Sequence, residues 1–430
     1  MNYLKVLADW NFWDDNQIDT GVNRKKYLLS LGRLMKMPEI ISVLGVRRCG
    51  KSTILLQIIR EIHSKKKVPY ENCLYINFED PRLGNDLQAS HLFAILDEYR
   101  KTFKPKGRVY LFLDEVQNVG SWEKFCRTIY DQKEDIKILL TGSTSETFNS
   151  DLSKLLSGRI INFNVSPLDF AEFLDFKKAD QSLSPANKLF DEYLQFGGFP
   201  RVVLEPNETN KLSLLISYYE TIIEKDVILK NDIKNKAELK NLTRFVLSNI
   251  GNQISSYALE KTLKISNENI GRYLNFLEES FIISRIPLFS YSVKKQIYNP
   301  DKVFVVDTGL SKVAGFSFSE NRGRLLENLV YQKLCQADSQ VYYWKNKTEI
   351  DFLIFAGGKV EQLINVTQTV DDPEVRQREI GSLTMAKKEF PDAKEMLLSL
   401  YNQSRQEDGR VGSLIDFLLK ETGQYVSRSN

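Results

Sequence analysis

The segment from Gly45 to Ser52 has the residue types and the spacing of a phosphate-binding loop. It reads G-x-x-x-x-G-K-[ST] and lies between two apolar runs, as expected between a buried strand and a helix. Glycines let backbone N–H groups converge on phosphate oxygens, and the following helix directs the positive end of its dipole at the same point. Lys51 can reach the β- and γ-phosphates, and the Ser52 hydroxyl can ligate Mg²⁺. A chance match in an ordinary strand–turn–helix is the alternative.

We expect a nucleotide to contact every residue of this loop and the first residues of the helix. These residues are Gly45, Val46, Arg47, Arg48, Cys49, Gly50, Lys51, Ser52 and Thr53. Lys51 has a catalytic role in this interpretation, because its charge lies where charge develops during phosphoryl transfer.

A second motif consists of the apolar run 109–113 followed by Asp114 and Glu115. Such a run is typical of a parallel strand buried on both faces, and ligands bind at the carboxyl ends of such strands. We expect Asp114 to hold Mg²⁺ through water and Glu115 to orient and deprotonate the attacking water. A solvated strand end is the alternative. With the phosphate loop upstream, the pair favours hydrolysis over nucleotide storage and predicts an ATPase.

Hydroxyl residues follow a third apolar run, 137–140. Ser143 or Thr141 could hydrogen-bond the attacking water or the γ-phosphate, and we assign this sensor role to Ser143. Both residues are also ordinary turn formers, and this alternative stays open. A further strand is predicted from residue 73, and Asn77 or Glu79 near its end could restrain Glu115.

The composition indicates a globular protein of two to four domains. The chain has 430 residues, 42% hydrophobic and 27% charged, with a net charge of +3. No stretch approaches the ~20 apolar residues of a membrane span, and the N-terminus lacks the apolar core of a signal peptide. Four scattered cysteines without a C-x-x-C pair argue for a reducing compartment and against a zinc site, and the two histidines argue against histidine-based chemistry. We expect a cytoplasmic protein without a membrane partner.

The order of predicted elements gives a domain plan. An N-terminal segment, 1–20, precedes an α/β core of parallel strands at 21–168. Residues 169–233 read as helices interrupted by the Gly-Gly-Phe-Pro turn at 197–200, consistent with a helical lid over the nucleotide.

Residues 234–292 predict a winged helix, that is, three helices followed by a hairpin of strands at 281–286 and 291–293. The third helix would expose residues able to reach the major groove of DNA. These residues are Asn267, Asn269, Arg272 and Asn275. Glu268 and Glu278 oppose phosphate contacts, so a winged helix used for contacts with a protein partner is an equal alternative.

Together these motifs resemble those of bacterial and archaeal P-loop ATPases of the AAA_14 type fused to a DUF4143 C-terminal region. The similarity covers about residues 20 to 370. It is carried by the phosphate loop, by 111–116 and 140–143, by Gly158-Arg159, by 197–200 and by Asp307-Thr308-Gly309-Leu310. The resemblance implies an AAA+-like core that uses ATP and Mg²⁺, a winged helix, and an α+β restriction-endonuclease-like domain at 293–430. It also implies that Arg159 is a finger or sensor for the γ-phosphate; an ion-pair partner is the alternative.

The C-terminal domain departs from the nuclease pattern. A nuclease of this fold would use Glu327 and Asp351 with a later Glu-x-Lys to hold Mg²⁺ and activate water, whereas this chain has Asn365 and Thr367 at the Glu and Lys positions. Both the metal-compensating carboxylate and the cation are lost. We therefore expect a degenerate domain without nuclease activity.

The sequence thus predicts a Mg²⁺-dependent ATPase whose nucleotide cycle moves the C-terminal domains, on DNA or against a protein partner, with oligomers possible. A nucleotide-gated signalling or scaffold module with little turnover is the alternative. An ATP-linked nuclease is a third, less favoured interpretation.

Overall fold

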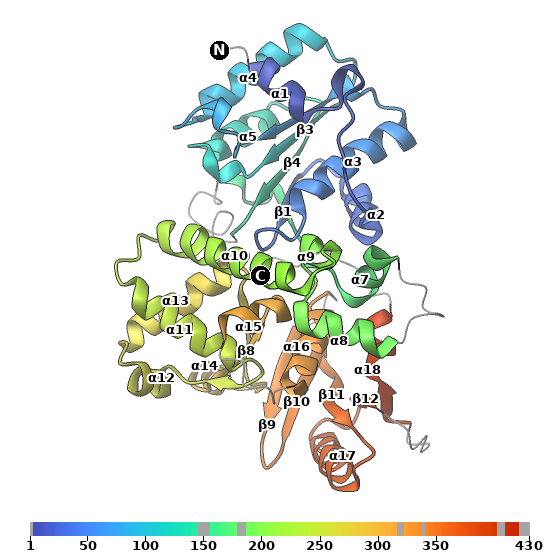
Figure 1. Cartoon of the computed structure of the whole chain (residues 1–430), viewed down its shortest axis with the longest axis vertical. Helices are drawn as coiled ribbons and strands as arrows, with labels where there is room; N and C mark the ends of the chain where they lie inside the picture. Colours follow the sequence, from blue (N-terminus) through green and yellow to red (C-terminus); the bar gives the residue numbers. More distant parts are fainter. Residues whose placement is uncertain are drawn as a thin grey trace. The chain divides into compact units, whose positions relative to one another are not determined.

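The computed structural model describes residues 3–144, 155–178, 186–315, 322–336, 340–401 and 409–420. These residues form two compact units, Met1–Ser166 and Pro167–Gln424 (Figure 1). Within the described parts of the chain, no helix is both long enough and apolar enough to cross a membrane.

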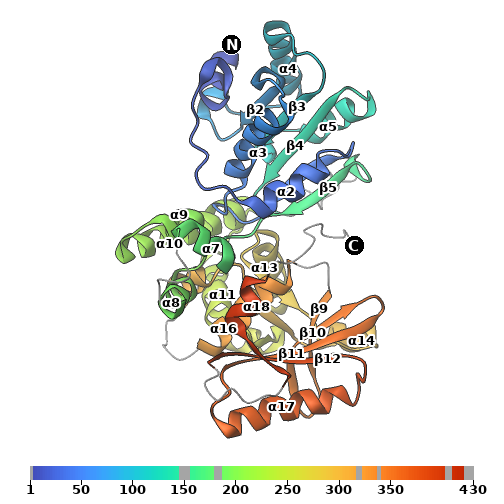
Figure 2. The same ribbon diagram turned by 90° about the vertical axis from the view of Figure 1, so that its right-hand side faces the viewer.

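The first unit is built on a five-stranded sheet with the order β2-β3-β4-β1-β5, and every adjacent pair is parallel. The strands are β1 (Ile40–Leu44), β2 (Cys73–Asn77), β3 (Val109–Asp114), β4 (Ile136–Gly142) and β5 (Ile160–Asn164). The flanking helices are α2 (Lys25–Leu34), α3 (Lys51–Lys66), α4 (Ala89–Phe103) and α5 (Trp122–Asp131) (Figures 1 and 2). The apolar runs form β1 to β4 because both faces of this sheet are covered. The predicted α/β core with a parallel sheet is confirmed.

The N-terminal segment covers the outer edge of β2. It contains α1 (Tyr3–Leu7) and two 3₁₀ turns, η1 (Ala8–Trp10) and η2 (Trp13–Asp15). The side-chain amide of Asn11 donates to the Tyr75 carbonyl at 2.8 Å and accepts from the Tyr75 N–H at 2.8 Å. The Trp13 indole N–H donates to the Cys73 carbonyl at 3.0 Å. These bonds pair an otherwise open strand edge, so the segment set apart as 1–20 is part of the first unit.

The second unit begins with helices and continues with three helices around a small sheet. The first helices are α7 (Phe170–Lys177), α8 (Ala186–Phe196), α9 (Pro200–Leu204), α10 (Glu208–Thr221) and the π-helix η7 (Ile222–Leu229). The next group is α11 (Lys236–Ser248), β6 (Gln253–Ile254), α12 (Ser256–Leu263), α13 (Asn267–Glu279), β7 (Ile283–Ile286), α14 (Val293–Tyr298), β8 (Asp301–Val305) and α15 (Thr308–Ala314). Its sheet has the order β6-β8-β7, with both pairs antiparallel.

The predicted hairpin was only half right. The first strand is present as β7, but its partner is β8 rather than 291–293. Ser292 accepts a hydrogen bond from the Lys295 N–H and starts the short helix α14 instead. The boundary drawn at 292 therefore falls between two strands of one sheet.

A mixed five-stranded sheet follows, with the order β13-β12-β11-β10-β9. Its elements are α16 (Arg322–Leu334), β9 (Gln340–Lys345), β10 (Glu349–Ala356), β11 (Lys359–Thr369), α17 (Pro373–Lys387), β12 (Lys394–Tyr401), β13 (Val411–Ser413) and α18 (Leu414–Leu419). Strands β9, β10 and β11 are antiparallel, whereas β11 and β12 are parallel and are joined through α17. A hairpin turn at Gly357-Gly358 joins β10 and β11, with both residues at positive φ.

The segment before α14 is anchored in this mixed sheet. The Phe289 side chain lies in the core formed by β9, β10, β11 and α17, and its N–H donates to the Tyr343 carbonyl at 2.7 Å. After α14, the Pro300 carbonyl accepts a hydrogen bond from the Tyr343 hydroxyl at 2.5 Å. Both ends of α14 are thus held by β9.

The two glycines of the Gly-Gly-Phe-Pro turn lie against the side chain of Asp307. The buried Asp307 carboxylate accepts hydrogen bonds from the Gly198 N–H at 2.6 Å and the Gly309 N–H at 2.9 Å. A Cβ atom at Gly197, which has φ +71°, would lie 1.9 Å from Asp307 Oδ1. The turn between α8 and α9 is therefore fastened to the start of α15, which explains two motifs of the resemblance.

We expect Gly197→Ala to destabilise the second unit by more than the ~1–2 kcal/mol that a left-handed alanine costs, because the new methyl group also displaces Asp307. Gly358→Ala is the matched control: Gly358 has φ +82° and open space around its Cβ position. Urea unfolding of both variants measures the difference. Equal losses of stability would contradict this account of the turn.

Candidate active site

The strand register brings the predicted site residues to one edge of the parallel sheet. Leu44 at the end of β1 pairs with Gly142 on β4, and Leu113 on β3 pairs with Leu140. The phosphate loop leaves β1 at this edge, and Asp114 ends β3 there. The carboxyl ends of the strands therefore collect the loop, Asp114 and the hydroxyl residues that follow β4.

The loop conformation depends on its two glycines. Gly45 has φ +151°, and a Cβ atom there would lie 2.0 Å from the Val165 carbonyl oxygen. Gly50 has φ +105° and is the last residue before α3. Neither position accommodates an ordinary side chain without strain. Because glycine has no side chain, the loop backbone can approach a phosphate closely at the N-terminus of α3.

Lys51 is the first residue of α3 and directly follows Gly50. Its side chain is buried, and its ammonium group donates to the carbonyl oxygens of Gly45 at 3.0 Å and Val46 at 3.3 Å. The same nitrogen lies 3.8 Å from Glu115 Oε1. Lys51 and the acidic pair, predicted from separate motifs, are therefore neighbours.

Both carboxylate oxygens of Asp114 are held by hydroxyl groups. The Tyr75 hydroxyl donates to Oδ2 at 2.6 Å, and the Thr141 hydroxyl donates to Oδ1 at 2.6 Å. The Thr141 oxygen also accepts from the Glu115 N–H at 2.8 Å. Burial, followed by the neighbouring Asp114 charge, raises the pKa of Tyr75 well above its usual value, so the phenol remains a hydrogen-bond donor.

Glu115 adopts a left-handed conformation, φ 54° and ψ 50°, which is uncommon for a residue with a side chain. The carboxylate is buried and accepts a hydrogen bond from Gln117 Nε2, which also lies 3.5 Å from the Ser143 hydroxyl. Burial raises the pKa of Glu115, and the Asp114 charge acts in the same direction against the attraction of Lys51. A raised pKa suits a carboxylate that accepts a proton.

The remaining loop residues differ in their surroundings. Val46 and Cys49 are buried, and the Cys49 thiol donates to the Val165 carbonyl at 3.3 Å. Arg47 forms an ion pair with Glu79 at 2.7 Å, so Glu79 contacts the loop. Arg48 and Thr53 are exposed.

Arg159 is far from this site. Its carbonyl accepts a hydrogen bond from the N–H of Ile40, the first residue of β1, which places it at the opposite edge of the sheet, about 16 Å from the loop along five strand residues. Its side chain forms an ion pair with Asp131 at 2.9 Å. Within its own chain Arg159 therefore lies away from the loop and pairs with Asp131, and its role as a finger or sensor for a γ-phosphate stays a prediction.

The residues at the sheet edge fit Mg²⁺ and a nucleoside triphosphate. The glycine backbone can cradle phosphates, Ser52 lies in the first turn of α3, and both oxygens of Asp114 are held by hydroxyl donors. When bound, Mg²⁺ would neutralise phosphate charge between Ser52 and Asp114. Sequence reasoning missed Tyr75 and Gln117, which carry no motif, and the contact of Tyr75 with Asp114 depends on the strand order.

A family model for an AAA domain, AAA_14, matches residues 37–174. The uncharacterized protein MJ1544 of Methanocaldococcus jannaschii is 34% identical over 376 residues, which cover 82% of this chain and 80% of that protein. The chain belongs to this family of AAA P-loop ATPases. An uncharacterized protein of Haemophilus influenzae is 29% identical over 406 residues, which cover 93% of this chain and 99% of that protein.

Two further comparisons concern the rest of the AAA protein. The model that matches residues 187–320 is a domain of unknown function, DUF8612, where the resemblance had pointed to DUF4143. The solved Walker-type ATPase PABY2304 of Pyrococcus abyssi is 18% identical, with a TM-score of 0.45, covering 68% of this chain and 95% of that one.

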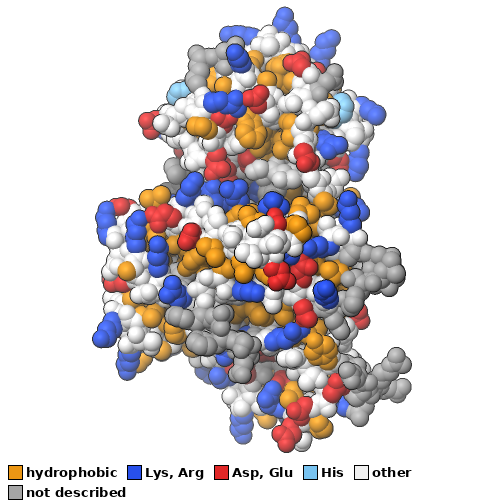
Figure 3. All heavy atoms as spheres, viewed as in Figure 1, with side chains coloured by type: hydrophobic (Ala, Val, Ile, Leu, Met, Phe, Trp, Pro, Cys, Tyr) orange, Lys and Arg blue, Asp and Glu red, His pale blue; other side chains and the backbone are white. Residues whose placement is uncertain are grey.

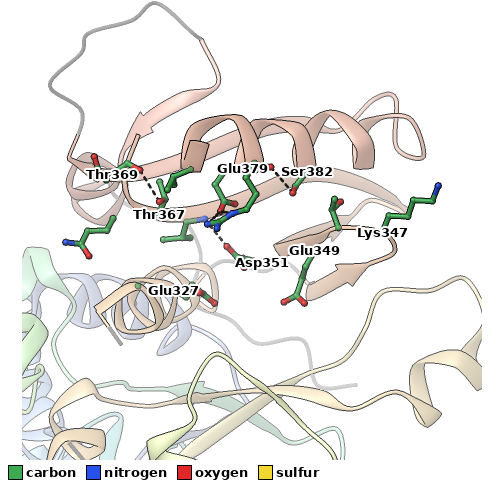
Figure 4. Close-up of a pocket in the computed structure, with 14 residues that line it drawn as sticks. Glu327, Lys347, Glu349, Asp351, Thr367, Thr369, Glu379 and Ser382 are labelled. Atoms are coloured by element: carbon green, nitrogen blue, oxygen red, sulfur yellow. Dashed lines mark hydrogen bonds and ion pairs between the residues drawn. The ribbon is translucent and has the colours of Figure 1, made fainter. Parts of the chain in front are cut away.

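A second group of charged residues lines a cavity of about 840 Å³ in the second unit (Figure 4). Glu327 from α16 and Asp351 from β10, both expected from the resemblance, lie beside it together with Glu349. Asn365 on β11 accepts from the Asp351 N–H at 3.2 Å and donates to Glu379 on α17 at 2.9 Å. Across the described ranges, no cluster of three or more His, Cys, Asp or Glu side chains is arranged to hold a metal ion.

Lys302 from β8 supplies the positive charge of this cluster. Its buried ammonium group lies 2.7 Å from Glu349, 3.3 Å from Asp351 and 3.9 Å from Glu327. Burial and the Asp351 charge raise the pKa of Glu327 well above its usual value. A lysine from another element thus compensates carboxylates that a metal ion would otherwise neutralise, and nothing in the local sequence of 302 predicts it.

We expect Lys302→Met to destabilise the second unit by about 3–5 kcal/mol at pH 8, because three carboxylates lose their shared cation. As the pH falls, protonation of these carboxylates removes their repulsion, and the loss should shrink, first through Glu327 with its raised pKa. Lys345→Met is the control, since Lys345 also pairs with Glu349, at 3.4 Å, but is half exposed. Urea unfolding at pH 8 and pH 6 measures both. A loss that stays constant with pH would contradict the charge-compensation account.

Proposed function

We propose that this protein is a Mg²⁺-dependent ATPase. The observation that carries the proposal is the convergence of Lys51, Asp114 and Glu115, with Lys51 Nζ 3.8 Å from Glu115 Oε1 and Asp114 fixed by two hydroxyl donors. Membership of the AAA P-loop ATPase family supports ATP as the nucleotide.

The proposal gives each group a role. The loop N–H groups and Lys51 bind the β- and γ-phosphates, and Ser52 and Asp114 would hold Mg²⁺. Glu115 accepts a proton from the attacking water, and its raised pKa favours that transfer. The link from Ser143 through Gln117 to Glu115 supports a role for Ser143 in sensing the γ-phosphate or the water. A module that binds ATP with little turnover remains the alternative function.

We expect Lys51→Ala to abolish nucleotide binding or turnover, and Glu115→Gln to bind ATP but to lower phosphate release by at least about 100-fold, because the base is lost while the pocket keeps its shape. Steady-state phosphate release and nucleotide binding measure the two steps separately. Hydrolysis at the wild-type rate by Glu115→Gln would refute the role of Glu115. Binding without measurable turnover by the wild type would favour the low-turnover module.

We further propose that the winged-helix region, α11 to β8, binds duplex DNA. Its exposed cations include Lys240, Arg244, Lys261, Lys264 and Arg272, whereas Glu268 is the one exposed carboxylate of 236–279, all of which the structure describes. Lys and Arg side chains gather on the left side of Figure 3, over this region. Glu278, which opposed DNA in the sequence, forms an ion pair with Arg285 at 2.6 Å.

The link between β7 and β8 adds to this surface. Residues 287–300 contain Lys294 and Lys295 and no carboxylate, and Tyr291 and Tyr298 are 77% and 78% exposed. Cations suit phosphates, and exposed aromatic rings suit sugars and bases. A protein partner at this surface is the alternative.

We expect the double variant Lys294→Glu/Lys295→Glu to weaken duplex DNA binding by about tenfold or more and to lower the slope of log affinity against log salt by about 2, one for each lost phosphate contact. Lys65→Glu/Lys66→Glu is the matched control, a neighbouring exposed pair at the end of α3. Fluorescence anisotropy across a salt series measures both. Equal effects of the two variants would point to general electrostatics and against this surface.

No nuclease activity is proposed, because Asn365 and Thr367 replace the Glu and Lys of the nuclease pattern and Lys302 occupies the carboxylate cluster. Plasmid nicking that survives Asp114→Ala but vanishes on changing Asp351 would overturn this.

A further inference from the structure

The two groups proposed to hold Mg²⁺, Ser52 and Asp114, are joined by a third residue that belongs to no motif. Tyr75 on β2 is 1% exposed and points toward β3, where its hydroxyl donates to Asp114 Oδ2 at 2.6 Å. Hydrogen bonding from the Ser52 side chain acts on the same group, in the direction that lowers the pKa of Tyr75 against the burial that raises it. A chain of hydrogen bonds therefore runs from Ser52 through Tyr75 to Asp114.

This chain fixes the direction of both ligand groups. Asp114 receives one donor from β2 and one from β4, through Tyr75 and Thr141, so its carboxylate cannot rotate without breaking a bond to a charged group. Because the Ser52 proton is donated to Tyr75, the lone pairs of the Ser52 oxygen remain available for a cation. Both effects prepare the pair for a hard divalent ion.

The position of Tyr75 is set from outside the sheet. Asn11 pairs with both backbone groups of Tyr75 at 2.8 Å, and its amide nitrogen also donates to the Leu7 carbonyl at 2.8 Å. Asn11 is buried, and no other backbone strand pairs with this side of β2 in the five-stranded sheet. The N-terminal segment thus fixes the position of Tyr75, which in turn hydrogen-bonds Asp114.

We propose that Tyr75, fixed in place by Asn11, is a positioning residue that orients Ser52 and Asp114 for Mg²⁺. The inference rests on the proposed ATPase function. It extends the metal site to a strand and an N-terminal segment that carry none of the nucleotide motifs.

The test is the effect of Mg²⁺ on ADP affinity, measured by calorimetry with the full chain in Mg²⁺ and in EDTA. In Tyr75→Phe we expect ADP affinity in EDTA to stay within about twofold of the wild type, while the gain in affinity due to Mg²⁺ falls about tenfold, the size of one lost hydrogen bond to a charged group. The concentration of Mg²⁺ that half-activates hydrolysis should rise by a similar factor.

Tyr99→Phe is the matched control. Tyr99 is as deeply buried in the same unit, and its hydroxyl donates to the Glu71 carbonyl rather than to a site residue. Its removal should leave the Mg²⁺ effect unchanged. Asn11→Ala should act in the same direction as Tyr75→Phe, and thermal unfolding of each variant checks that the fold is intact.

A wild-type Mg²⁺ effect in Tyr75→Phe, a stronger one, or an equal loss in Tyr99→Phe would overturn the inference while the ATPase function stands. Absence of nucleotide binding and turnover in the wild type would overturn both.

Discussion

The hydrogen bonding of the Asp114 carboxylate is the constraint on which the nucleotide site depends. Three adjacent strands contribute to it, because Tyr75 on β2 and Thr141 on β4 hold the two oxygens of a residue that ends β3. The Thr141 hydroxyl oxygen also accepts a hydrogen bond from the Glu115 N–H, so the same side chain restrains the backbone of Glu115. A buried carboxylate held in this way is stable only if its donors stay in register, so the order of the strands is part of the chemistry.

Charge explains why this arrangement suits a cation. Lys51 Nζ lies 3.8 Å from Glu115 Oε1, and burial, with the Asp114 charge acting in the same direction, raises the pKa of Glu115. A divalent ion at this edge of the sheet would add positive charge beside the two carboxylates. The acidic cluster of the second unit differs, because there the ammonium group of Lys302 lies among three carboxylates. In the proposed function the first acidic site takes an ion, whereas in the second the protein itself supplies the cation.

Sequence patterns predicted the elements whose signals are local. The apolar runs 109–113 and 137–140 form β3 and β4, and the phosphate loop and the acidic pair lie together as their motifs required. The failures concern contacts between distant segments. Tyr75 reads as one more apolar strand residue, and Lys302 as an ordinary surface charge, until β2 is placed beside β3 and β8 beside α16. The position of Arg159 beside the first residue of β1 was not predicted either, because a motif does not reveal at which end of a strand it hydrogen-bonds.

The anchoring of α14 at both ends has a mechanical consequence. The chain leaves β7, joins β9 through Phe289, projects as α14 and returns past the Tyr343 hydroxyl to β8. A force on α14 therefore acts on both sheets, because the segment is hydrogen-bonded to β9 on either side of the helix and continues into β7 and β8. The β6-β8-β7 sheet and the mixed sheet should therefore move together when a force acts on α14.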